Sequence, residues 1–213
     1  LVTLPTIYLD ALLTYEDRYF YDHPGVNPIS LLKSPYQDIR AGEIVSGGST
    51  LTMQLARLSR HNPPRTFPEK TLEILMALKA EMFMSKDRIL AEYAAHAPFG
   101  SNVVGLEAAC WRFFGRGADQ LSWAQAATLA VLPNSPALIF PGKNQQKLRV
   151  KRNALLERLC QRGYLDSATC RLAQSEPVPG PPSEIAQMAP HLATRLKDLG
   201  QGGKRITTSL DRQ

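Results

Sequence analysis

The 213 residues are near the upper limit for a single domain, and 44% apolar with 21% charged residues predicts an ordinary globular core. The sequence has no apolar run of about 18 residues and no signal-peptide pattern, so nothing in it is expected to span a membrane. The net charge of +6 is compatible with a soluble protein that has a mildly basic face, or with an anionic partner such as a phosphorylated small molecule, acidic lipid or nucleic acid. Nucleic acid is the least favoured of these, because the sequence has no combined basic and aromatic platform. Because the first residue is Leu1 rather than Met, we expect a piece of a longer protein, and any membrane anchor would lie upstream of it.

Helices are predicted one after another along the chain. Hydrophobic spacing, capping residues and Gly/Pro breaks predict them at residues 5–21, 49–60, 66–84, 87–95, 106–114, 122–131, 150–161, 167–174 and 185–199. Residues 26–48 are irregular, which indicates a long loop or a broken short helix. The proline-rich segment 175–184 indicates a linker or an extended surface strap, and residues 205–210 have β-propensity without a visible partner.

The predicted helix 66–84 carries a carboxylate in an unusual setting. Thr66 with Glu69 forms a capping-box pattern, and apolar residues then occur on nearly every face, so we expect this helix to be central and buried. Glu73 lies between Leu72 and Ile74, where a solvated position is hard to arrange. Because charges are seldom fully buried without a partner or a task, Glu73 is a candidate catalytic residue.

A second carboxylate, Glu16, is placed near the end of the first predicted helix. Taken alone, the pair Glu16-Asp17 would usually face solvent. Two carboxylates on different helices, however, are what glycosyl chemistry needs, because one can move a proton while the other positions or stabilises charge.

The stretch GGSTLTMQLARLSR, residues 47–60, indicates anion binding. Its two glycines lead into a capped helix start, where backbone N–H groups and the hydroxyls of Ser49 and Thr50 could approach a phosphate. Gln54 and Arg57 follow one and two turns later. Farther along the chain, Lys70 and Lys86 add cations, although each could equally be a solvated lysine.

The three cysteines show no metal-binding spacing. Cys110 lies in an apolar run and is expected to be a buried small hydrophobic residue. Cys160 and Cys170 could form a disulfide, a possibility that the sequence leaves open.

Five stretches, EDRYFYDHPG, GGSTLTMQ, RTFPEKTLE, KDRILAEY and KRNALL, resemble in order and spacing the motifs of the peptidoglycan glycosyltransferase domain of class A bifunctional penicillin-binding proteins. HAPFG and LAVLPNSP look most like the 1C type. The resemblance runs from about residue 5 to 165. It implies a mainly α, lysozyme-like fold with a mobile membrane-facing jaw at about residues 26–48. It also implies a glycosyltransferase domain over residues 1–175 and, in residues 176–213, a linker toward a transpeptidase domain absent from this chain.

The resemblance implies that lipid II is polymerised into glycan strands, with inversion and release of undecaprenyl pyrophosphate, at the periplasmic face of the bacterial inner membrane. The implied partners are lipid II, the growing glycan chain and, through the jaw, the membrane surface. Glu16 would be the general base for the acceptor 4-hydroxyl. Glu73 would assist the departing pyrophosphate, directly or through Mg²⁺ or Mn²⁺. The implied substrate- and phosphate-binding residues are Asp17, Phe20, His23, Gly48, Ser49, Thr50, Gln54, Arg57, Arg65, Lys70, Lys86 and Arg152.

Several positions depart from the family pattern. Glu69 stands where arginine is common, Met53 replaces a frequent glutamine, Asn27 a frequent aspartate, and Ala94-Ala95 the usual Leu-Asn. These departures keep open a catalytically weak or silent module that binds lipid II or scaffolds other wall enzymes. A peptidoglycan-cleaving, lysozyme-like enzyme is a further alternative, but it would need no pyrophosphate-binding residues.

Overall fold

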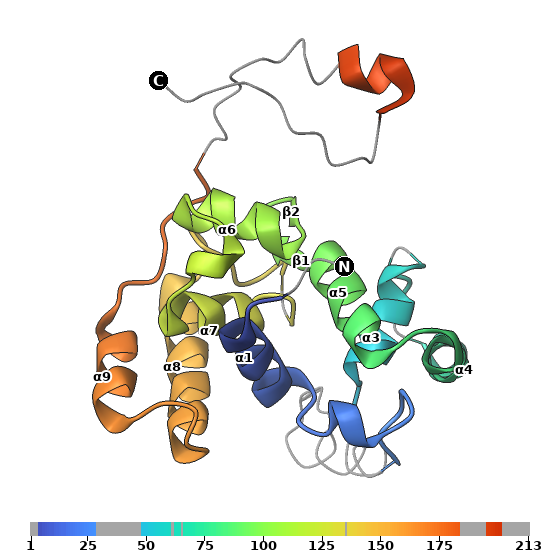
Figure 1. Cartoon of the computed structure of the whole chain (residues 1–213), viewed down its shortest axis with the longest axis horizontal. Coiled ribbons are helices and arrows are strands. Elements are labelled where there is room, and N and C mark those ends of the chain that lie inside the picture. The colour runs from blue at the N-terminus through green and yellow to red at the C-terminus, as the bar shows by residue number, and fades with distance from the viewer. Residues whose placement is uncertain are drawn as a thin grey trace. The chain divides into compact units, whose positions relative to one another are not determined.

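The chain divides into two compact units, Leu1–Ser183 and Glu184–Gln213, and helices dominate the first. The structure, a computed structural model, describes residues 4–28, 48–60, 62–64, 66–134, 136–183 and 195–201. The first unit contains α1 (Thr6–Glu16), η1 (Phe20–Asp22), α3 (Leu51–Leu58), α4 (Phe67–Phe83), α5 (Lys86–His96), α6 (Leu106–Phe114), η2 (Ala118–Gln120), α7 (Trp123–Val131), α8 (Gln145–Gln161) and α9 (Ser167–Ser175), as Figure 1 shows. The predicted mainly α fold class is therefore confirmed.

Several predictions from the sequence concern segments that lie wholly or largely outside the described residues. They are the greater part of the predicted jaw, most of the predicted helix 185–199 and the stretch 205–210. In the second unit, the described residues contain the short helical segment η3 (Lys197–Gln201). The predicted division of the chain at residue 175 stays a prediction. Within the described residues, no helix is both long and apolar enough to cross a bilayer.

Side chains at the helix starts explain where several helices begin. The hydroxyls of Thr50 and Thr66 accept hydrogen bonds from the third backbone N–H group that follows each of them. The cap at Thr66 was predicted, and the sequence left the first of these caps open between Ser49 and Thr50. Ser122 forms a full capping box with Gln125, and Asp166 accepts two backbone N–H groups at the start of α9. These contacts satisfy N–H groups that have no partner inside their own helix.

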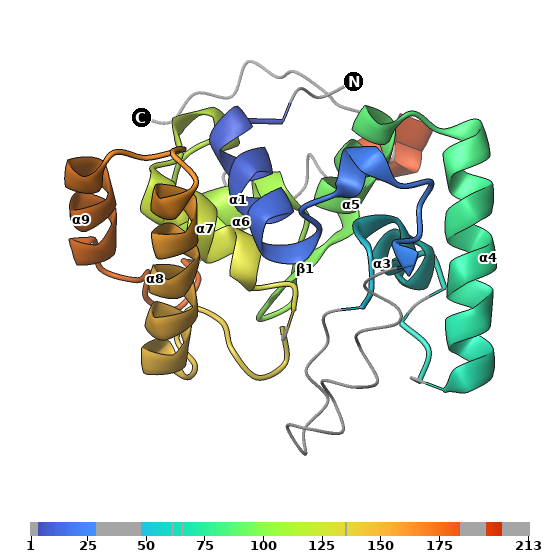
Figure 2. The same cartoon turned by 90° about the horizontal axis from the view of Figure 1, so that it is seen from below.

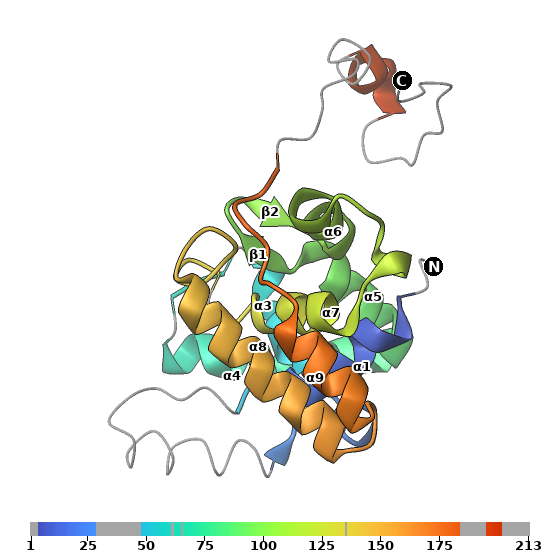
Figure 3. The ribbon, with the colours of Figure 1, turned by 90° about the vertical axis from the view of Figure 1, so that its left-hand side faces the viewer.

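The core lies where α1, α7 and α8 pack against one another. Residues Ala124 and Ala126–Val131 of α7 are all buried, as its apolar sequence predicts, and Tyr8 and Leu12 of α1 are fully buried beside them. Helices α8 and α9 lie side by side on one flank of this core (Figure 3). Cys160 and Cys170 on these two helices are free, so the disulfide left open by the sequence is not formed.

Helix α4 lies at the opposite side of the unit from α8 and α9, against α3 and α5 (Figure 2). The prediction that this helix is central and buried is wrong, because only Glu73 and Ala77 are buried in it. Six large apolar side chains of α4 are exposed, and we call them the outer face of α4: Phe67, Leu72, Leu75, Leu78, Met82 and Phe83. An apolar pattern on all sides of a helix predicts burial only where neighbours cover every side.

Of two features between helices, the hairpin was not predicted, whereas the proline-rich segment was expected to be a linker or an extended surface strap. A short antiparallel hairpin joins β1 (Pro98–Gly100) to β2 (Val103–Val104) through Ser101 and Asn102, which both have positive φ. Residues 176–183 continue from α9 as an extended strap, in which the carbonyl of Pro179 accepts a hydrogen bond from Gln145. The hairpin matters for function because it presents Pro98 to the cavity described next.

Candidate active site

A cavity of about 310 Å³ brings the two candidate catalytic carboxylates together. Glu16 reaches it from the C-terminal end of α1, and Glu73 reaches it from the middle of α4. The cavity is lined by Glu16, Ser49, Gln54, Arg57, Leu58, Asn62, Glu73, Tyr93, Pro98, Pro133, Asn134 and Pro136. Residues 57 positions apart in the sequence therefore face one common space, as the pairing of two carboxylates requires.

Asp17 fixes the end of α1 beside the start of α3. Its buried carboxylate accepts a hydrogen bond from the backbone N–H of Leu51 at 3.0 Å and contacts Nε2 of His23 at 3.0 Å. A carboxylate at a helix N-terminus is favoured by the helix dipole. Because Glu16 directly precedes Asp17, this contact holds Glu16 next to α3.

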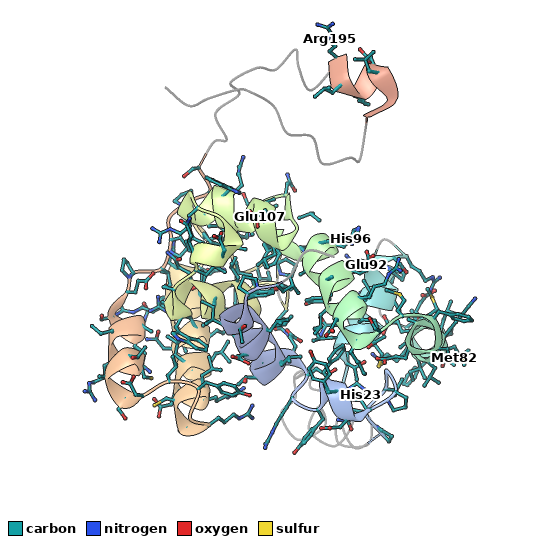
Figure 4. The ribbon with its side chains drawn as sticks, in the orientation of Figure 1. His23, Met82, Glu92, His96, Glu107 and Arg195 are labelled. Carbon is teal, nitrogen blue, oxygen red and sulfur yellow. The ribbon has the colours of Figure 1, made fainter. Side chains whose placement is uncertain are left out.

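The segment after α1 is held by a lysine. Lys86 Nζ donates to the carbonyl of His23 at 2.6 Å and to Oε1 of Glu81 at 2.8 Å, and it lies 4.4 Å from the ring centroid of Phe20. Asp17, Phe20, His23 and Lys86 therefore pack around the turn that follows Glu16 and do not themselves line the cavity. Figure 4 shows His23 in this turn, below α5.

Glu16 is hydrogen-bonded to α3, which in turn contacts α5. The amide Nε2 of Gln54 donates to Oε2 of Glu16 at 2.7 Å, and the hydroxyl of Tyr93 donates to Oε1 of Gln54 at 3.2 Å. Three helices thus contribute one chain of hydrogen bonds that ends at the carboxylate. A carboxylate that accepts an N–H donor is stabilised in its ionised form.

Glu73 is buried between two cations. Lys70 Nζ lies 3.0 Å from Oε2 of Glu73, and Nε of Arg57 lies 4.0 Å from Oε1. Lys70 also donates to the hydroxyl of Ser49 at 2.7 Å, and Arg57 donates to the carbonyl of Pro63 at 2.9 Å. Glu73 and these two cations leave a net positive wall, in which Arg57 lines the cavity and Lys70 lies behind Ser49 and Glu73. Such a wall suits a ligand with more than one negative charge.

The surroundings of Glu73 do not fit a resident divalent ion. Both of its carboxylate oxygens face the cations Lys70 and Arg57. Among the described residues, no group of three or more His, Cys, Asp or Glu side chains is arranged to hold a metal. Mg²⁺ and Ca²⁺ sites need several oxygen ligands, which the surroundings of Glu73 do not supply.

Several residues that the resemblance implies to bind substrate or phosphate do not line the cavity or lie outside the described residues. Arg152 is fully buried and donates to the backbone carbonyls of Glu176 at 2.6 Å and Gln174 at 3.0 Å, so the structure does not bring it to the cavity. The hydroxyl of Thr50 donates a hydrogen bond to the carbonyl oxygen of Gly25 at 2.5 Å. Gly48 is buried just before Ser49 without lining the cavity, and Arg65 lies outside the described residues.

Three residues near Glu16 were missed by the sequence reasoning. Tyr93 and Asn134 line the cavity, and Nζ of Lys151 lies 3.3 Å from Oδ1 of Asn134. Burial lowers the pKa of Lys151, and the negative charge of Glu16 partly opposes that shift. Tyr93 and Lys151 both lie in stretches that resemble family motifs, so the motifs could have pointed to them. In the motif KRNALL, the sequence analysis selected Arg152 as the site residue instead of its neighbour Lys151.

The departure at Glu69 is compensated within the structure. Its carboxylate forms a two-pronged ion pair with the guanidinium of Arg60, so it adds no unpaired negative charge beside the cavity. The cationic wall formed by Lys70 and Arg57 is therefore kept despite the acidic substitution.

Two carboxylates facing one cavity, with cations beside one of them, are an arrangement that glycosyl chemistry can use. The transglycosylase family model matches residues 1–160. The chain therefore belongs to the transglycosylase family of peptidoglycan glycosyltransferases, and it shares the mainly α, lysozyme-like fold class expected of that family.

Curated relatives are penicillin-binding proteins. Penicillin-binding protein 1C of Escherichia coli is 40% identical over 204 residues, which cover 96% of this chain and 26% of that protein. Penicillin-binding protein 1A of Pseudomonas aeruginosa is 36% identical over 82% of this chain and 21% of that protein. The chain thus spans about a quarter of the length of these relatives. A crystal structure of penicillin-binding protein 1A from Haemophilus influenzae covers 72% of this chain and 20% of its own, at 16% identity and a TM-score of 0.41.

Proposed function

We propose that this chain polymerises lipid II into glycan strands, with Glu16 as the general base and undecaprenyl pyrophosphate as the leaving group. The observation that carries the proposal is the shared cavity of Glu16 and Glu73, with Arg57 and Lys70 beside Glu73. The proposed substrates are lipid II and the growing glycan chain, handled at the periplasmic face of the inner membrane.

At the acceptor side, Glu16 takes the proton from the 4-hydroxyl of the acceptor sugar as that oxygen attacks the anomeric carbon of the donor. Attack from the face opposite the leaving group gives inversion. Gln54 donates to one oxygen of Glu16 and so favours the ionised carboxylate that a base requires. The proton transfer accounts for about 10²- to 10⁴-fold of the rate.

At the donor side, Lys70, Arg57 and the hydroxyl of Ser49 hold the diphosphate. Charge develops on the leaving diphosphate in the transition state, and cations already in position stabilise it without reorganisation. Glu73 keeps Lys70 and Arg57 in position through its two carboxylate oxygens. Its buried negative charge also returns the cations to this arrangement once the diphosphate departs.

The test is polymerisation of lipid II in detergent by wild type and by Glu16→Gln. We expect the variant to lose at least about 10²-fold in rate with an unchanged melting temperature. Glu92→Gln, which removes a half-exposed carboxylate of α5, is the matched control and should retain activity. A Glu16→Gln enzyme as fast as wild type would refute the assignment of the base.

The alternative functions predict other outcomes. A silent lipid II-binding module would bind lipid II but produce no glycan with any variant, wild type included. A peptidoglycan-cleaving enzyme would release muropeptides from purified sacculi, and we expect none. No feature of the cavity favours either alternative, since the departure at Glu69 is balanced by Arg60.

We further propose that the outer face of α4 contacts the membrane. Met82 projects at the outer side of α4 in Figure 4, and Phe67, Leu75 and Leu78 share this face. At about 100° per residue, the acidic residues of α4 all fall outside this apolar arc, whereas the exposed Lys79 falls within it. An apolar helix face with a cation suits an anionic lipid surface.

Co-sedimentation with phosphatidylglycerol vesicles tests this contact. Leu75→Glu with Met82→Glu should reduce vesicle binding at least about tenfold, because carboxylates would enter the lipid interface. Leu172→Glu replaces an exposed leucine of α9 and is the matched control. Equal binding by both proteins would refute contact through α4 and leave the predicted jaw contact to be tested.

A further inference from the structure

We propose that Tyr93 is a positioning residue that orients the amide of Gln54 and thereby sets the proton affinity of Glu16. This inference rests on the proposed role of Glu16 as the base. The geometry that supports it is the chain of hydrogen bonds from Tyr93 to Gln54, at 3.2 Å, and from Gln54 to Glu16, at 2.7 Å.

A glutamine amide has a donor end and an acceptor end, and only the donor end can face an ionised carboxylate favourably. If the amide of Gln54 were turned over, its carbonyl oxygen would stand against Oε2 of Glu16, and two acceptors would repel. The hydroxyl of Tyr93 opposes this rotation because it donates to the carbonyl oxygen of the amide, and turning the amide over would take this acceptor away from a buried O–H group. Tyr93 thus keeps the N–H donor aimed at the base.

Tyr93 is suited to act as a permanent donor. Its side chain is almost fully buried, between α3 and the core. Burial, and then the negative charge of Glu16, raise the pKa of Tyr93 well above its usual range, so the hydroxyl keeps its proton around neutral pH. The geometry and the protonation state therefore favour the same orientation of Gln54.

Tyr8 provides an internal comparison. It is fully buried on α1 and its pKa also responds to the charge of Glu16, yet its hydroxyl has no hydrogen-bond partner among the described residues. Removing this hydroxyl leaves the chain of hydrogen bonds intact. Among the described residues, the other titratable and charged groups that act on Glu16 or share its cavity are the same in both variants, namely Tyr15 of α1, Arg57 of α3, Glu73 of α4 and Lys151 of α8.

The experiment compares kcat against pH for wild type, Tyr93→Phe and Tyr8→Phe in lipid II polymerisation. Loss of the Tyr93 hydroxyl frees the amide to rotate, which removes stabilisation from the ionised form of Glu16 and raises its proton affinity. We expect the acid limb of the Tyr93→Phe profile to move up by about one pH unit, with KM changed less than about twofold. The Tyr8→Phe profile should overlay that of wild type.

A ¹³C NMR titration of the Glu16 carboxyl carbon gives the same shift without relying on turnover. If Tyr93→Phe does not fold, Gln54→Leu removes the donor directly and should shift this titration in the same direction. An unshifted titration in the folded variant, or an equal shift in Tyr93→Phe and Tyr8→Phe, would overturn the role of Tyr93. Should Glu16→Gln remain active, the assignment of the base itself fails, which is a separate outcome.

Discussion

Replacing Arg152 with alanine decides between two roles for this residue. The resemblance to the family implies a substrate-binding role, whereas the structure buries its guanidinium against the carbonyls of Gln174 and Glu176, with a third bond to Asn153. Arg152→Ala would leave two buried carbonyls without donors, at about 1–3 kcal/mol each, and would also remove the packing of the arginine stem. We expect a loss of about 4 kcal/mol in the free energy of unfolding.

In a unit of this size, that loss lowers the melting temperature by about 8–16 °C. Urea unfolding measures the free energy, and lipid II polymerisation at low temperature gives kcat and KM for the folded fraction. Both constants should stay within about threefold of wild type. Arg149→Ala removes an exposed arginine of the same helix and should change stability by less than about 0.5 kcal/mol. A stable Arg152→Ala enzyme with a strongly raised KM would refute the structural role.

Three other substitutions or reactions test particular contacts. Gly25→Ala should cost about 2–4 kcal/mol in urea unfolding, because Gly25 has φ +84° and a Cβ there would lie 2.8 Å from the carbonyl oxygen of Ala77. Burial raises the pKa of Cys110 to about 12, so at pH 8 its thiol stays protonated and should react with DTNB far more slowly in the native protein than in urea. Lys70→Met should lower kcat/KM by at least about 10²-fold, whereas Lys147→Met, at an exposed lysine of α8, should not.

The helices were largely predictable from the sequence because their signals are local. Helix α6 has the predicted bounds, Leu106–Phe114, and Thr50 and Thr66 begin α3 and α4 as their side chains indicate. The first helix is shorter than predicted. It ends at Glu16, because the carboxylate of Asp17 accepts a hydrogen bond from the backbone N–H of Leu51 at the start of α3. A tertiary contact overrides the local pattern there.

Two predictions that the structure does not support, for α4 and for Arg152, depended on which side of a helix its neighbours cover. The apolar pattern of α4 could not reveal that its outer face is left exposed by α3 and α5. Arg152 and Lys151 are adjacent in one motif but point about 100° apart, so only packing decides which of them lies near Glu16. The hairpin β1–β2 was missed because three- and two-residue strands carry almost no pattern.

The carboxylate of Glu73, in contrast, could be predicted from the sequence. Glu73 was singled out because a charge on an apolar helix needs a partner, and Lys70 and Arg57 supply that partner. The contact between Gln54 and Tyr93 had no such signal, since each residue is unremarkable within its own helix.

If the outer face of α4 rests on lipid as proposed, the width of this helix sets the height of the reaction above the membrane. Glu73 and the outer face are on different sides of α4, and an α-helix with its side chains is about 10–12 Å across. With the outer face resting on lipid, the diphosphate would be cleaved about one helix width above the hydrocarbon. A polyprenyl tail could then stay dissolved in the bilayer throughout turnover, while only its sugar head group is lifted to meet Glu16.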